Sequence, residues 1–360
     1  MTATLSTGMR ATLAALLALM LFMACDSATA QGRQSASVAY KIVTASERGT
    51  YIQIGRDLAK FVAPDAGIEL EAVPSAGSAE NVRRLRYEAG VKFALVQSDV
   101  YQAFLDLAES GNAEARELIQ PLRLIMPLYN EEIYFVARAD SPLDYVHEIK
   151  DAKINVGPLG SGTAMTATTV YRQLFDAQLP DANASFLTNE EALVKLTVDK
   201  SVDVVALVLG QPAKLLVDMK PEARQLIKLL KFDPSQPTSI AALKTYFEAT
   251  IRAGSYPALL SEDIKAISVK AYLVTYDYNV GMTVNRLTRF ARSLCSNFDK
   301  LQAQGHPKWR EVELALPELS RGWSYYPPMW QEMTNCIARR PKPVPVKVCS
   351  QQERILGLCK

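Results

Sequence analysis

The sequence predicts an α/β fold with two lobes, each a mostly parallel sheet flanked by helices. Three times in succession, a short apolar strand is followed by a polar turn and then by a helix. This rhythm is typical of parallel strands with helices on the faces of the sheet. A second set of such units follows, and a long apolar segment then returns the chain to the first sheet. Two lobes built in this order leave a cleft between them.

Composition and charge argue against nucleic-acid binding, metal binding and histidine-based catalysis. The 360 residues are 49% hydrophobic and 22% charged, which leaves room for two domains. The formal net charge of +2 gives no bias toward nucleic acid, so no nucleic-acid partner is expected. The two histidines, His147 and His306, are far apart in the sequence. We therefore expect no metal, no cofactor and no histidine-based catalysis.

The first thirty residues predict a signal peptide. Arg10 supplies a positive flank, and residues 11–24 form an apolar run too short to span a bilayer. An Ala-Thr-Ala cleavage motif follows, so the mature chain is expected to begin at Gln31. Lipidation at Cys25 is the competing interpretation, although the residues before Ala24 are bulky for a lipobox. Either alternative predicts export and a periplasmic location.

Export changes the interpretation of the remaining cysteines. Cys295, Cys336, Cys349 and Cys359 are even in number, and an oxidising compartment favours two disulfides with three possible pairings. Their spacing matches no common zinc pattern. We expect Cys349 and Cys359 to close a loop in a C-terminal tail at 331–360, and Cys295 and Cys336 to tie that tail to the body.

The first lobe is predicted to span 31–138 and 275–330. Its apolar strands and the helices that follow them are expected at 38–43, 51–62, 68–73, 79–87, 93–96 and 100–107. Two more strand-like runs, 122–127 and 132–138, lead to a crossing at Ala139. The polar turns gather at the carboxyl ends of the strands, where such sheets bind ligands.

The second lobe is predicted to span 139–274. Its strands, helices and the returning strand are expected at 154–156, 164–175, 187–200, 202–209, 226–230 and 264–275, with a short helix ending at Met219. A helix at 284–298 then belongs to the first lobe. The last forty residues, rich in proline, are expected to be irregular.

A glycine-rich turn opens the second lobe. Gly157, Gly160 and Gly162 join a buried strand to a helix that begins at Ser161 or Thr163. Free N–H groups in the turn and the positive end of the helix make an anion cradle. The turn lacks the lysine of a nucleotide P-loop, and no Gly-x-Ser-x-Gly elbow surrounds Ser161. We therefore expect a binding site rather than an enzyme.

Five short motifs resemble those of a known family, in the same order. They are Gly49–Tyr51, Pro74–Asn81, Ala94–Asp99, Leu128–Glu131 and Val156–Thr163. The chain resembles the TAXI family of solute receptors, which serve tripartite ATP-independent periplasmic (TRAP) transporters. The resemblance implies a periplasmic-binding-protein fold of type II. It also implies delivery of a small organic anion or amino acid, glutamate-like or a dicarboxylate, to a sodium-coupled TRAP membrane subunit. We expect the protein to be a monomer.

The sequence departs from the family pattern in three places. Ser75 and Ala76 stand where threonine and glycine are typical, and Val204–Leu209 lacks the aromatic residues often found there. The cysteine-bearing tail has no counterpart. These departures leave the ligand class open. A receptor-like sensor or scavenger that works without a transporter is the alternative function.

The expected ligand-binding residues follow the strands of both lobes. A carboxylate at helix N-termini needs no dedicated arginine, because N–H groups and hydroxyls supply charge-assisted hydrogen bonds. In the first lobe these residues are Thr50, Tyr51, Ser75, Gly77, Ser78, Asn81, Gln97, Ser98, Asp99 and Tyr129. In the second lobe they are Gly160, Ser161, Gly162 and Thr163.

Several of these residues have a competing structural role. Asp99 could accept a hydrogen bond from a ligand ammonium or could cap its own helix. Asn81 could be an ordinary exposed polar residue. Tyr51 and Tyr129 could wall the pocket or pack in the core. Ser161 and Thr163 could simply cap their helix.

Overall fold

A computed structural model describes residues 37–319, 322–340 and 351–356. Val38–Lys360 forms one compact unit. The predicted signal peptide with Cys25, and the expected Cys349–Cys359 pair, lie outside the described residues. No helix in the described ranges combines the length and the apolar character that a membrane crossing needs.

Lobe I, named here for the elements built around β1–β3, begins with three parallel strands. β1 pairs with both β2 and β3. The elements are β1 (Val38–Val43), α2 (Thr50–Phe61), β2 (Ile68–Val73), α3 (Ser78–Tyr87), β3 (Val91–Gln97), α4 (Ser98–Glu109) and α5 (Ala113–Ile119). Each strand is followed by a helix, as the sequence predicts. The helices bury apolar faces on the sheet, such as Ile54 and Leu58 of α2 and Val82 and Leu85 of α3.

Lobe II, built around β5–β9, repeats the pattern with shorter elements. β5 pairs in parallel with both β6 and β7. The elements are β5 (Ile154–Asn155), α6 (Gly162–Phe175), β6 (Ala184–Ser185), α7 (Asn189–Val194), β7 (Val204–Leu209), α8 (Lys214–Val217), α9 (Pro221–Arg224), β8 (Ile227–Leu229), α10 (Ser239–Ala242) and β9 (Phe247–Ile251). A π-helical turn, Lys195–Asp199, continues α7. β7 is buried along its whole length, as a continuous apolar run predicts.

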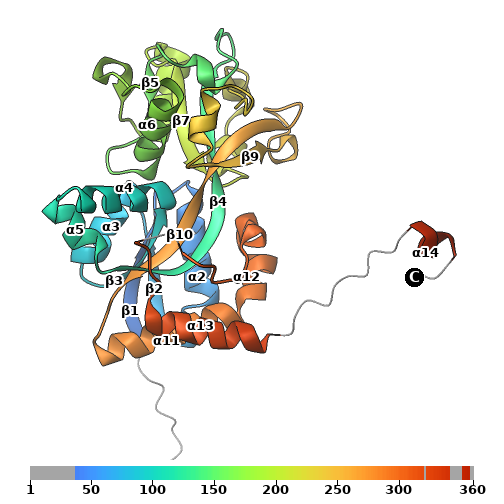
Figure 1. Ribbon diagram of the computed structural model, residues 1–360. Helices are drawn as coiled ribbons and strands as arrows, with labels where there is room; N and C mark the ends of the chain where they lie inside the picture. Colours follow the sequence, from blue (N-terminus) through green and yellow to red (C-terminus); the bar gives the residue numbers. More distant parts are fainter. Residues whose placement is uncertain (1–36, 320–321, 341–350, 357–360) are drawn as a thin grey trace, which may run out of the picture. The chain divides into compact units, whose positions relative to one another are not determined.

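Two long strands, β4 (Leu122–Arg138) and β10 (Ile264–Tyr276), belong to both lobes. They pair antiparallel with each other, and together they make one ten-stranded sheet in the order β2-β1-β3-β10-β4-β7-β5-β6. Figure 1 shows them side by side along the molecule. β10 also pairs with β3 and β9, and β4 with β7 and β8. The expected α/β fold class, with mostly parallel strands flanked by helices, is confirmed, and β4 and β10 join the strands of both lobes into one sheet.

The strands expected at 122–127 and 132–138 are one continuous strand. The polar segment between them keeps its pairing, because Asn130 and Glu131 lie opposite Lys270 and Val269 of β10. The register shifts just beyond this point, between Lys270 and Tyr272. The predicted lobe boundaries, 138/139 and 274/275, therefore fall at the end of β4 and inside β10, whereas the passage between lobes runs through the middle of both strands.

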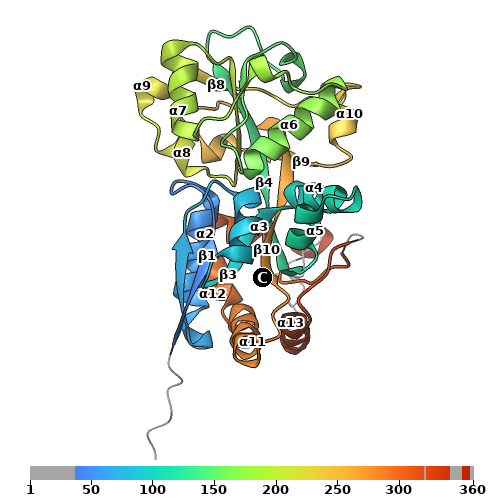
Figure 2. The same ribbon diagram turned by 90° about the vertical axis from the view of Figure 1, so that its left-hand side faces the viewer.

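The C-terminal part returns to lobe I. It contains α11 (Gly281–Ser296), α12 (Phe298–Gln304), α13 (Pro327–Arg339) and α14 (Gln351–Ile355). Short 3-10 turns lie at Pro64–Ala66, Val146–Glu148, Asp181–Asn183, Ala253–Ser255 and Pro307–Glu311. Figure 2 shows α11 and α13 next to each other, in keeping with their many contacts.

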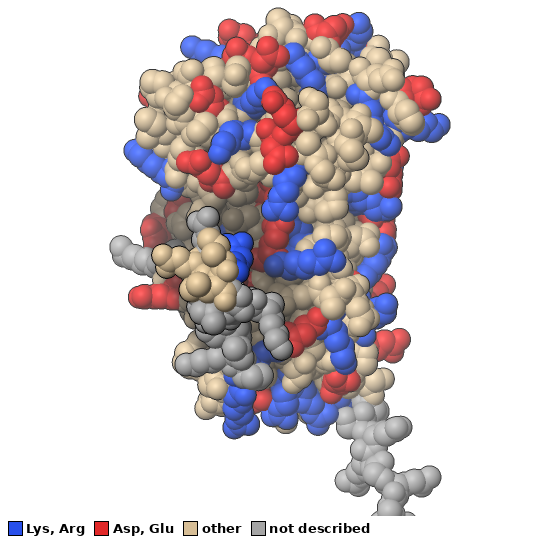
Figure 3. Space-filling model, turned by 90° about the vertical axis from the view of Figure 1, so that its right-hand side faces the viewer, with Lys and Arg blue, Asp and Glu red and all other residues tan. Residues whose placement is uncertain are grey.

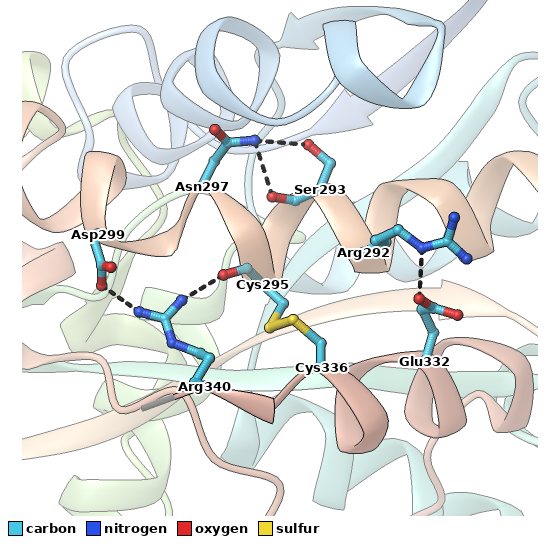
Figure 4. Close-up of a disulfide and its surroundings, with 8 residues drawn as sticks. All are labelled: Arg292, Ser293, Cys295, Asn297, Asp299, Glu332, Cys336 and Arg340. Atoms are coloured by element: carbon cyan, nitrogen blue, oxygen red, sulfur yellow. Dashed lines mark hydrogen bonds and ion pairs between the residues drawn. A yellow bond between two sulfur atoms is a disulfide. The ribbon is translucent and has the colours of Figure 1, made fainter. Parts of the chain in front are cut away.

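The expectation that the last forty residues are irregular is wrong for α13. Its two prolines occupy the first turn, where a missing N–H costs nothing. Met329 and Met333, one helical turn apart, are buried against lobe I. The disulfide Cys295–Cys336 fastens α13 to α11, as expected (Figure 4).

The surface carries both signs of charge. On the face drawn in Figure 3, lysine and arginine side chains are interspersed with aspartate and glutamate. Ion pairs such as Lys231–Glu262 and Arg138–Asp140 account for some of this mixing.

Candidate functional site

A cavity of about 280 Å³ lies at the carboxyl ends of strands from both lobes. Nine of the fourteen predicted ligand-binding residues line it. They are Thr50, Tyr51, Ser75, Gly77, Ser78, Gln97, Ser161, Gly162 and Thr163. The turn after β1, the turn after β2, the end of β3 and the glycine turn after β5 therefore meet at one place.

Two helix N-termini face the cavity. α2 begins at Thr50 behind an extended Gly49, and α6 begins at Gly162 behind Ser161. The Ser161 hydroxyl accepts from the N–H of Ala164 at 3.0 Å, so it caps α6, as the competing interpretation held. Capping leaves the first N–H groups of α6 without partners among the described residues. The positive ends of two helices thus favour an anion here.

Gly162 occurs where two lobes approach closely. A Cβ atom at this position would lie 1.6 Å from Oε1 of Gln97 and 2.8 Å from Oγ of Ser78. Gly77 has a φ of +134°, and a Cβ there would lie 3.2 Å from the Gly162 nitrogen. Glycine is required at both positions, because a side chain would push the turn of lobe II away from lobe I.

The glycine turn also caps a helix in lobe I. The Gly160 carbonyl accepts from the N–H groups of Ala79 and Glu80, at 3.1 and 3.0 Å. A second contact between the lobes joins Thr50 to Gly210: the Thr50 hydroxyl donates to the carbonyl at 3.2 Å and accepts from the N–H at 3.0 Å. These bonds hold the lobes together at the rim of the cavity.

Glu131 of β4 is a buried carboxylate in the cavity wall. Its side chain is 3% exposed and accepts a long hydrogen bond from Nε2 of Gln97 at 3.4 Å. Burial is the main reason that its pKa rises to about 8. Burial and the neighbouring Glu131 charge raise the pKa of Tyr51 well above its usual value. The Tyr51 hydroxyl interacts with the side chains of Glu131 and Ser78.

A second buried carboxylate, Glu132, is fully paired. Lys308, which is 0% exposed, donates from Nζ to Glu132 Oε1 and to Glu311 Oε2, each at 2.6 Å. Gln211 adds hydrogen bonds to Glu132 from its backbone N–H at 2.8 Å and its side-chain amide at 3.0 Å. This network joins β4 to the turn after β7 and keeps the lysine engaged.

Five predicted residues do not line the cavity. Asn81 is fully buried, and its amide donates to the carbonyls of Thr44 and Leu95, so it is not an exposed polar residue. Ser98 starts α4. Gly160, which contacts α3, is not among the residues that line the cavity. Tyr129 is buried in the core of lobe I, as its competing role held.

Asp99 is the fifth, and it connects the lobes. Inside the first turn of α4 it accepts from the N–H of Val100 at 2.8 Å, and it also accepts hydrogen bonds from Thr166 of α6 at 2.6 Å and from the Tyr246 hydroxyl at 3.0 Å. Burial is the main cause of its raised pKa. Its hydrogen-bonding capacity is therefore used by lobe II rather than left open to the cavity.

Other lining residues were not predicted. They are Ala45, Ser46, Gly49, Ala76, Glu131, Pro158, Thr188, Asn189, Glu190, Val208 and Leu209. Several border predicted positions, and Glu131 ends one of the quoted motifs. Thr188 and its neighbours form the start of α7, with Thr188 in a capping box with Glu191. That Thr-x-x-Glu pattern was the available signal for a helix start near the site.

Comparison with known proteins now assigns the family. The model of the NMT1-like family matches residues 42–322, well over half of the chain. The chain belongs to the NMT1-like family. The match covers the turns that line the cavity, whereas α13 and the residues after it lie beyond it.

Solved structures share the fold of this NMT1-like protein. The binding-protein component of a phosphonate ABC transporter from Pseudomonas aeruginosa is 12% identical, with a TM-score of 0.51 over 89% of this chain and 93% of that chain. The periplasmic binding protein BugD is 12% identical, with a TM-score of 0.49 over 84% of this chain and 95% of that chain. At such identities the likeness concerns the fold alone.

Proposed function

We propose that this NMT1-like protein is an exported solute receptor. It captures a small organic anion or amino acid between its lobes, releases it unchanged, and delivers it to a TRAP-type membrane subunit. The carrying observation is the cavity that joins the N-termini of α2 and α6, because it offers hydrogen-bond donors from both lobes to one anionic group.

Several features support binding rather than turnover. The cavity is small, near the lower end of the usual range for ligand pockets. Its lobe-to-lobe contacts through Gly160 and Thr50 suit a cleft that closes on its ligand, a common signal between receptors and membrane partners. The TAXI-like motifs, rather than the fold, favour a TRAP partner over an ABC partner.

Ligand binding is tested on the chain from Gln31, refolded so that it is free of ligand. Thermal unfolding is followed with amino acids, dicarboxylates and 2-oxoacids, and a ligand present at 100 times its Kd should stabilise the protein by about 2.7 kcal/mol. The double variant Ser161→Ala with Thr163→Val should weaken binding of any stabilising compound while the circular dichroism spectrum is unchanged. If no compound in the panel shifts the transition, the proposed function is wrong.

The transport step is tested in cells that produce the protein. Deleting its gene should abolish uptake of the stabilising compound, and uptake should fail when sodium is replaced by potassium. Uptake that persists without a sodium gradient but stops on ATP depletion would point to an ABC partner. Normal uptake in the deletion strain would favour a sensor or scavenger.

A further inference from the structure

The ionisable residues of the cavity are all acidic. Within the described part of the chain, no lysine, arginine or histidine side chain lines it, and the two acidic lining residues are Glu131 and Glu190. Lys308, whose charge reaches Glu131, is held by two other carboxylates at 2.6 Å each. The second carboxylate of a dicarboxylate would therefore meet an acidic side chain and no free cation among these residues.

An unsatisfied polar atom lies beside Glu131. Oε1 of Gln97 has no hydrogen-bond partner among the described residues, although this side chain is only 3% exposed. The Gln97 oxygen can only accept a hydrogen bond. Leaving buried polar atoms unpaired is costly, so a ligand that pairs them gains correspondingly.

The chemistry of these atoms selects one kind of group. The Glu131 carboxylate and the Gln97 oxygen both need donors, and an ammonium carries three donors and no acceptor. Its positive charge also pairs the buried carboxylate, which a neutral hydroxyl would not. The N-termini of α2 and α6 supply the complementary donors for an anion in the same cavity.

Resting on the proposed function, we propose that the cavity takes a small zwitterion, with its carboxylate at the two helix N-termini and its ammonium on Glu131 and Gln97. Glu131 is then the residue that discriminates amino acids from dicarboxylates. The cavity volume of about 280 Å³ suits a ligand of amino-acid size.

Proton linkage gives an independent readout. The titratable groups that face Glu131 are Tyr51 of α2, Tyr129 and Glu132 of β4, and Lys308. Because the pKa of Glu131 is about 8 without ligand, most of the protein at pH 7 carries a protonated Glu131. An ammonium needs the carboxylate, so its affinity should rise about tenfold per pH unit up to pH 8 and binding should release a proton. A dicarboxylate would accept from the protonated form, so its affinity would stay nearly constant up to pH 8 and fall above it.

The decisive experiment compares matched pairs by titration calorimetry: L-aspartate with succinate, L-glutamate with glutarate, and L-alanine with propionate. We expect each amino acid that binds to have an affinity at least tenfold higher than that of its amine-free partner. Glu131→Gln, which keeps the shape of the side chain, should weaken the amino acid about 10- to 100-fold and flatten its pH profile. Glu71→Gln, an exposed change on β2, is the control and should leave affinity unaltered.

The outcomes separate the two proposals. If amine-free partners bind as tightly as amino acids, or bind more tightly, the zwitterion is wrong and the receptor function stands. An unchanged affinity for the amino acid in Glu131→Gln also overturns the inference. If no member of any pair binds, the zwitterion is wrong, and the wider panel with 2-oxoacids decides the receptor function. Should Glu131→Gln fail to fold, the matched pairs and the proton release measured on the natural chain decide the question.

Discussion

The loss of stability on removing the disulfide between α11 and α13 can be predicted quantitatively. Cys295 is fully buried, and its partner Cys336 lies 41 residues further along the chain. Closing a loop of that length removes unfolded-state entropy equivalent to about 4 kcal/mol at 25 °C. The double variant Cys295→Ala with Cys336→Ala should therefore lose about 4 kcal/mol of its free energy of unfolding.

Ion pairs near the disulfide do not replace that contribution. Arg292 of α11 pairs with Glu332 of α13 at 2.6 Å, and Arg340, just after α13, pairs with Asp299 of α12 at 2.5 Å (Figure 4). Each is a solvent-exposed ion pair, and such pairs contribute about 0–1 kcal/mol. The disulfide therefore remains a larger contribution than either ion pair.

Urea unfolding followed by circular dichroism measures the loss. A change of about 4 kcal/mol should lower the midpoint by roughly 1–2 M. The double variant is preferred to a reducing agent, because a reductant also reaches Cys349 and Cys359. Asn335→Ser, an exposed change on the same turn of α13, is the control and should stay within about 0.5 kcal/mol. A midpoint equal to that of the natural chain, or a free Cys295 in peptide mapping under non-reducing conditions, would refute the reasoning.

Three further predictions follow from contacts of the cleft. Gly162→Ala should weaken ligand binding about 5- to 150-fold, because overpacking costs about 1–3 kcal/mol on closure. The control Gly281→Ala is also at a helix start but has open space around it, so it should leave ligand binding unchanged. Calorimetry with the stabilising compound compares the affinities of the two variants. Lys308→Met removes the cation from the buried Glu132 and should lower the free energy of unfolding in urea by about 3–5 kcal/mol; a loss below 1 kcal/mol would contradict this. Tyr246→Phe removes a hydrogen bond to the buried Asp99 and should weaken ligand binding by about tenfold without altering the fold, and an unchanged Kd would show that this contact does not favour closure.

Much of the fold could be predicted because its signals are local. In lobe I the sequence alternates apolar strands with polar turns and helices, although the strands lie in the sheet in the order β2-β1-β3. By contrast, the continuity of β4 could not be seen, because Asn130 and Glu131 look like a polar break until β10 lies opposite them. α13 was missed because the prolines at 341–345, beyond its end, suggested an irregular tail, although Met329 and Met333 have helical spacing.

Some residues of the candidate site could likewise be predicted from the sequence, and others could not. Thr50, Ser78 and Gly162 could be found because they follow strands in a predicted parallel sheet. Glu131 could not, since its role depends on burial and on which groups face it across the sheet, neither of which is written in its neighbours. Asp99 shows the reverse, because its position after β3 suggested a ligand contact until Thr166 was brought against it.

Hydrogen bonds to the carbonyl of Gly160, in lobe II, make two amides of lobe I report whether the cleft is open or closed. In the closed arrangement it shields two amides of α3, those of Ala79 and Glu80, and opening would return both to water. Amide hydrogen exchange at these two positions would thus count openings of the cleft from the opposite lobe. A partner that touches lobe I alone would in turn meet a helix whose N-terminus is neutralised when the cleft is shut and bare when it is open.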